Sequence, residues 1–100
     1  MPEAGYLIRP SSHEGWLEIP ASSLAEVLTP RGYPTEPGDG FGDLHLRATD
    51  YEISFSGEDP GRQVSVDGDI AHLNTDELIA QVARQIEDFT GTATEWIRIT

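Results

Sequence analysis

The stretch TDELIAQVARQIEDFTG, residues 75 to 91, decides the fold class, because the rest of the chain must supply a surface for it. Its apolar residues recur three or four positions apart, which is the spacing of one face of an α-helix. Asp76 and Glu77 fall in the first turn, where the helix dipole favours anions, and Gly91 is placed for a left-handed residue that ends the helix. The stretch predicts an amphipathic helix whose buried stripe is Leu78, Ile79, Val82, Ile86 and Phe89.

Residues 43 to 67 supply an apolar surface that this helix can cover. The segments DLHLRA (43–48), YEISFS (51–56) and RQVSVD (62–67) alternate apolar and polar side chains, as strands with one buried face do. Turn residues separate them at 49–50 and at 57–61. The closing segment TEWIRIT (94–100) predicts a further strand. The expected inward side chains are Leu44, Leu46, Ile53, Phe55, Val64, Val66, Ile97 and Ile99.

The N-terminal part of the chain predicts smaller elements. GYLIRP (5–10) and GWLEIP (15–20) read as two strands of a hairpin, and Ser23 with Glu26 fits a capping box at the start of a short helix that Pro30 ends. Residues 31–43 form a loop rich in Gly and Pro. The sequence therefore predicts one domain, residues 1–100, of the α+β class: a two-layer sandwich with a mainly antiparallel sheet, one long helix and one short helix. Whether the hairpin joins the main sheet stays open.

The acidic stretch VSVDGDIAHLNTDEL (64–78) raises the question of a metal site. An EF-hand loop that began at Asp67 would have Ala71, His72 and Leu78 at its fifth, sixth and twelfth positions, where oxygen ligands and glycine are needed. A strand that turns at Gly68 and a helix capped by Asn74 or Thr75 explain the same residues. No metal and no cofactor are expected.

The net charge is −12, from 18 acidic and 6 basic residues, and all the basic residues are arginine. This composition is typical of a GC-rich bacterial or phage genome. Such a surface repels nucleic acid and anionic membranes and attracts a basic protein. The chain has no cysteine, and it shows neither a signal peptide nor an apolar run long enough to span a bilayer, so a cytoplasmic protein is expected.

Catalysis has little support in the sequence. There is no Cys or Lys nucleophile, and His13, His45 and His72 fall in different elements. Ser12, His13 and Glu14 are triad residue types, but neighbours in sequence point in different directions and do not form a relay. The chain is therefore expected to bind a partner rather than to act as an enzyme.

The polar face of the predicted sheet is the first candidate for binding. Trp96 with Arg98 and Arg47 on that face has the composition of an interaction hot spot, unless Trp96 packs under another part of the chain. The loop and the following turn add further candidate contacts. These are Glu36, Asp39, Phe41, Asp43 and Asp59.

The acidic strands GDLHLRATDYEISFSGEDPGRQVSV (42–66), the helix at 75–91 and the closing EWIRI (95–99) resemble the small acidic immunity proteins of bacterial polymorphic toxin systems. The resemblance implies an inhibitor that covers the basic active site of a toxin or nuclease, as a monomer or dimer. Two alternatives remain open: an assembly module whose exposed sheet face self-associates, and a phage-type inhibitor that mimics the charge of DNA.

Overall fold

The computed structural model describes residues 3–12, 19–38, 44–58, 61–71 and 73–99. Their strands are β1 (Glu3–Pro10), β2 (Glu36–Pro37), β3 (Leu44–Arg47), β4 (Tyr51–Glu58), β5 (Gly61–Gly68) and β6 (Thr94–Arg98). Their helices are a 3₁₀ turn, η1 (Ala21–Ser23), a short helix, α1 (Leu24–Leu28), and a long helix, α2 (Thr75–Thr90).

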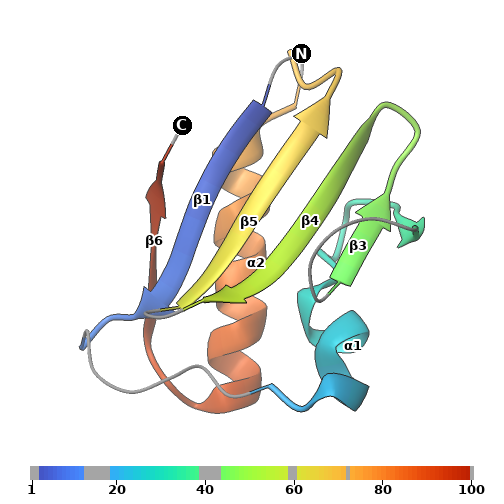
Figure 1. The fold of residues 1–100 in the computed structure, drawn as a ribbon. Coiled ribbons are helices and arrows are strands. Elements are labelled where there is room, and N and C mark those ends of the chain that lie inside the picture. Colours follow the sequence, from blue (N-terminus) through green and yellow to red (C-terminus); the bar gives the residue numbers. More distant parts are fainter. Residues whose placement is uncertain (1–2, 13–18, 39–43, 59–60, 72, 100) are drawn as a thin grey trace.

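The six strands form one antiparallel sheet in the order β2-β3-β4-β5-β1-β6. Helix α2 crosses one face of this sheet, and α1 lies on the same side (Figure 1). The predicted α+β two-layer sandwich is confirmed. We call the face toward α2 the helix face and the opposite face the open face.

Helix α2 begins and ends as the sequence predicts. The side chain of Asn74 accepts a hydrogen bond from the backbone N–H of Glu77 at 3.0 Å, and Gly91 adopts a left-handed conformation with φ 72°. Four of the five residues of its predicted stripe are fully buried, but Phe89 is 47% exposed, so its assignment to the core was wrong. It lies in the last turn of the helix, on a hollow lined by residues of α1 and α2 and by Arg31.

The meander β3-β4-β5 buries the side chains that alternation predicts. Leu46, Ile53, Phe55, Val64 and Val66 are all 1% exposed or less, and Leu44 packs against them. The two-residue period holds because each of these strands has one face against helices and one against solvent.

The prediction for the closing strand was wrong. Ile97 is 39% and Ile99 is 54% exposed, whereas Trp96 packs against the core. Trp96 lies beside Ile8 in the register, on the helix face, and its ring meets that of Tyr6 edge-on, with centroids 5.7 Å apart. At an edge strand both faces carry apolar residues, so alternation alone does not tell which face is buried.

The predicted N-terminal hairpin was also wrong. Strand β1 pairs with β5 through residues 3–8 and with β6 through residues 6–10, so both of its edges are taken by other partners. Ile19 and Pro20 are not in a strand, and the rest of the second predicted strand lies outside the described residues. The first strand therefore joins the main sheet, between β5 and the edge strand β6.

The short helix forms, but without its predicted capping box. Ser23 precedes α1 with φ −107° and ψ −5° and makes no side-chain cap hydrogen bond. The C-terminal end of α1 is held instead by Gln85 of α2, which is only 4% exposed. Its amide nitrogen donates to the carbonyls of Val27 and Thr29, at 2.8 Å each.

Because the pKa of each of the three tyrosines is raised in the folded chain, we expect the fold to lose stability at alkaline pH. Burial raises the pKa of Tyr6, Tyr33 and Tyr51, and the hydrogen bond from the Tyr6 hydroxyl to Asp76 raises the pKa of Tyr6 further. Unfolded tyrosine has a pKa near about 10, so the stabilisation is complete below that pH and is lost as the pH rises through the folded pKa values.

The chain contains these 3 tyrosines and no lysine or cysteine, so tyrosines dominate side-chain titration in this range. Urea unfolding between about pH 8 and pH 11 should show a falling free energy of unfolding above about pH 10, and Tyr6→Phe should make the fall shallower. A free energy that stays constant through this range would contradict the burial of these phenols.

Candidate protein-binding surface

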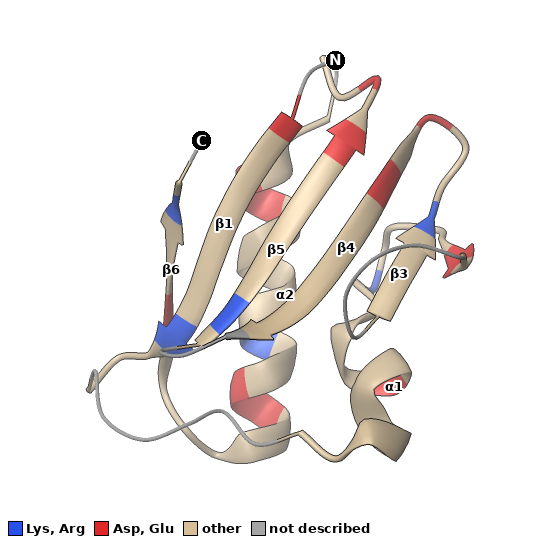
Figure 2. Ribbon diagram, viewed as in Figure 1, with Lys and Arg blue, Asp and Glu red and all other residues tan. Residues whose placement is uncertain are grey.

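Three carboxylates lie side by side across the open face. Glu3 of β1 is directly opposite Asp67 of β5, and Asp67 is directly opposite Glu52 of β4. Their sequence neighbours Ala4, Val66 and Ile53 are buried on the helix face, so these three side chains project from the open face. We call Glu3, Asp67 and Glu52 the carboxylate row. Figure 2 shows acidic positions gathered at this end of the sheet.

An ion pair continues the row toward the other edge of the sheet. Arg47 of β3 lies opposite Glu52, and Glu36 of β2 lies opposite Arg47. The guanidinium of Arg47 donates to the carboxylate of Glu36 at 3.0 Å. Because this cation is already engaged by Glu36, it offsets little of the charge of the carboxylate row.

His45 lies two residues before Arg47 on β3, on the same face of the sheet, and its side chain is only 10% exposed. Its Nδ1 lies 3.0 Å from the Ser54 hydroxyl, and its Nε2 lies 3.4 Å from the Glu52 carboxylate without hydrogen-bond geometry. The imidazole thus bonds to Ser54 of β4 and lies beside Glu52, at one end of the carboxylate row.

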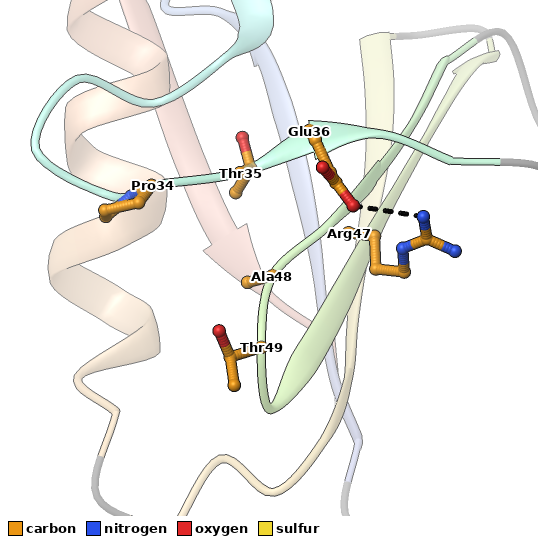
Figure 3. Close-up of a pocket in the computed structure, with 6 residues that line it drawn as sticks. All are labelled: Pro34, Thr35, Glu36, Arg47, Ala48 and Thr49. Atoms are coloured by element: carbon orange, nitrogen blue, oxygen red, sulfur yellow. Dashed lines mark hydrogen bonds and ion pairs between the residues drawn. The ribbon is translucent and has the colours of Figure 1, made fainter.

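Two open hollows lie beside the turn between β3 and β4, one next to the Arg47–Glu36 ion pair and one next to the carboxylate row. The first has a volume of about 540 Å³, and Figure 3 shows Glu36 and Arg47 joined at its rim. The second has a volume of about 490 Å³ and includes Glu52 and Asp67 in its lining. Arg47, Ala48 and Thr49 line both. The side chains of a partner that contacts the row could therefore occupy the space beside the charges.

The structure separates the residues that the sequence proposed as one surface. Arg47 and Glu36 lie together on the open face beside the carboxylate row. Trp96 and Arg98 do not belong there, because β6 presents them on the helix face at the far edge of the sheet. Arg98 bonds to Asp76 of α2 at 3.3 Å and lies 5.6 Å from the centre of the Tyr6 ring. Their assignment to the polar face was wrong.

The other predicted contacts, Asp39, Phe41, Asp43 and Asp59, lie outside the described residues. Sequence reasoning did not select Glu3, Asp67 or Glu52 as site residues. Alternation places Asp67 and Glu52 on a polar face, and Glu3 lies outside the first predicted strand, so only the longer β1 and the strand order β4-β5-β1 bring the three into one row. A pattern within each strand carries no information about which strand lies next to it.

Within the described ranges, no group of three His, Cys, Asp or Glu side chains is arranged to hold a metal ion. None of the described helices combines the length and the apolar character that a membrane span requires. Comparison with family models, curated proteins and solved structures gave no significant match.

Proposed function

We propose that this chain is a protein-binding inhibitor that holds a basic protein against the carboxylate row. The observation that supports the proposal is the strand register, which places Glu3 opposite Asp67 and Asp67 opposite Glu52. Like charges directly opposite each other on neighbouring strands destabilise a sheet by roughly 0.2–1 kcal/mol per pair. A row of three such groups, side by side in one register, costs stability, and a partner's Arg and Lys side chains would remove that cost.

The proposed mechanism is steric and electrostatic. The net charge of −12 speeds the encounter with a cationic surface, and the row with the hollow beside it then fixes the position of the partner. The partner is a basic toxin or nuclease domain of the kind that immunity proteins block, and the interaction takes place in the cytoplasm. The chain itself carries out no reaction in this proposal.

The carboxylate row makes a prediction that needs no partner. Glu52→Gln combined with Asp67→Asn removes two facing charges and should raise the free energy of unfolding by about 0.5–1 kcal/mol in low salt. The control pair, Glu26→Gln with Asp88→Asn, removes the same charges from exposed helix positions. It should change the stability by less than about 0.5 kcal/mol. Urea unfolding at low ionic strength measures both, and a loss of stability in the first pair would contradict the repulsion.

The same two variants test the binding. The neighbouring gene's product, purified and offered to the wild-type chain in a calorimeter, should bind tightly at low salt and more weakly at high salt. The row variant should bind at least about tenfold more weakly, which corresponds to about 1.4 kcal/mol, while the control variant binds almost as the wild type does. Equal weakening by the two variants would mean that only net charge matters, and would overturn the assignment of the row as the contact.

A further inference from the structure

The two edges of the sheet differ in how they are protected. At one edge, β2 has two residues, and one of them is Pro37, which has no backbone N–H to offer another strand. At the other edge, β6 has five residues, and among the described residues only β1 pairs with it (Figure 1). An edge strand of this length is a template for pairing with another chain.

The hydrogen bonds to β1 fix which backbone groups of this region point inward. The N–H of Ile99 donates to the carbonyl of Gly5 at 2.7 Å, and the N–H of Ser11 donates to the carbonyl of Ala93 at 2.9 Å. In an antiparallel ladder this alternation makes the backbone N–H and C=O groups of residues 95 and 97 point toward β1 as well. The backbone N–H and C=O groups of residues 94, 96 and 98 therefore point toward the outer edge of the sheet. The N–H of Thr94 is already bound by the Glu87 carboxylate at 2.9 Å.

The side chains of β6 also favour an apolar and locally neutral contact. Ile97 and Ile99, at this edge, are two of the three large apolar side chains that are exposed among the described residues. Glu95, the carboxylate of β6 itself, is paired with Arg9 at 2.8 Å, and Arg98 of β6 is paired with Asp76 of α2 at 3.3 Å. The one acidic side chain of β6 is therefore already neutralised by Arg9, whereas a second copy at the carboxylate row would meet facing carboxylates.

We propose that two copies of this chain form a twofold-symmetric dimer by antiparallel pairing of β6, with the axis at Ile97. In this register Ile97 faces Ile97 of the second copy on the open face, and Trp96 faces the second copy's Arg98 on the helix face. An axis at Trp96 would require the N–H of Thr94, which the Glu87 carboxylate already binds. An axis at Arg98 would place the two Arg98 side chains opposite each other.

Sedimentation equilibrium tests the surface. The wild type should have twice the mass of the chain, Ile97→Lys should be monomeric because it puts two like charges on the axis, and Phe89→Lys should remain dimeric. Phe89 is the matched control because its exposure, 47%, is similar to that of Ile97 and it lies on α2. A monomeric wild type, or a dimer that Ile97→Lys leaves intact, would overturn the proposal.

The salt dependence separates this dimer from the proposed inhibitor function. Two copies that each carry −12 repel each other overall, so added salt should strengthen the dimer. The same salt should weaken the binding of a basic partner. A dimer that salt dissociates would contradict pairing through an apolar edge, whatever the result with the partner.

Single cysteines test the register, because the chain has none of its own. At the axis the two Ile97 Cα atoms would lie about 4.5–5.5 Å apart, within reach of a disulfide, so Ile97→Cys should cross-link on mild oxidation. A cysteine at position 99 is also exposed, so random collisions would cross-link it as readily. In the proposed register, however, the two cysteines of an Ile99→Cys dimer would be offset by four residues along the strands, or about 13 Å, and should cross-link little. Equal cross-linking of the two variants would overturn the register.

Discussion

Replacing Gly61 with alanine should lower the free energy of unfolding by about 3 kcal/mol or more. A Cβ at this position would lie 2.1 Å from the carbonyl oxygen of Ile8 and 3.0 Å from the Cα of Arg9. Both atoms are backbone atoms of β1, so the clash cannot be relieved by a change of rotamer. The strands β1 and β5 would have to separate where β5 begins. Urea unfolding followed by circular dichroism measures the loss.

Gly91→Ala provides the matched control for this substitution. Gly91 has φ 72°, which disfavours alanine, but a Cβ there would meet no atom within 4 Å. The expected loss is only about 1 kcal/mol, the cost of a left-handed backbone for an alanine. If Gly61→Ala were tolerated as well as Gly91→Ala, the close approach of β1 to β5, and with it the position of β1 inside the sheet, would be wrong.

Gln85→Ala should lower the free energy of unfolding by a similar amount, about 3 kcal/mol, because three backbone groups would lose a partner at once. The amide of Gln85 donates to the carbonyls of Val27 and Thr29 and accepts from the backbone N–H of Arg31 at 2.9 Å. These groups belong to the end of α1 and the chain that follows it, where a helix leaves its last carbonyls without internal partners.

Two further variants separate the hydrogen bonds of Gln85 from the space it fills. Gln85→Leu restores most of the side-chain volume but none of the hydrogen bonds, so it should be nearly as destabilising as Gln85→Ala. Gln81→Ala, on the same helix, removes a contact between side chains and should cost less than about 1 kcal/mol. A stable Gln85→Leu protein would show that packing, and not the hydrogen bonds to α1, holds the two helices together.

The functional surface could be predicted only in part. The sequence places Arg47, Glu52 and Ser54 on a polar face, because their neighbours Leu46 and Ile53 must be buried. It does not reveal that Glu3, more than forty positions away from Glu52, lies on the next strand but one. The candidate site is a row across strands, and its members are brought together by strand order, which depends on contacts between distant parts of the chain.

The error at Trp96 has a different cause. Along β6, Trp96 alternates with Ile97, and both residues are apolar enough to be buried. The choice was made by Tyr6, which meets the Trp96 ring on the helix face, and by Asp76, which binds Arg98 from α2. No pattern within a five-residue strand contains these partners, so the hot spot predicted on the open face was instead part of the packing under the edge of the sheet.

By itself, the sequence determined those helices and strands for which the apolar pattern and the terminating residues indicate the same element. The helix at residues 75–90 follows from its apolar stripe, the Asn74 cap and Gly91, and the meander follows from alternation broken at two turns. Only the tertiary structure decided that β1 is inserted between β5 and β6, which face of β6 is buried, and which carboxylates face each other. The reason is physical: helix and strand periods are set by neighbours in the chain, whereas strand order and edge burial are set by contacts between segments that the chain keeps far apart.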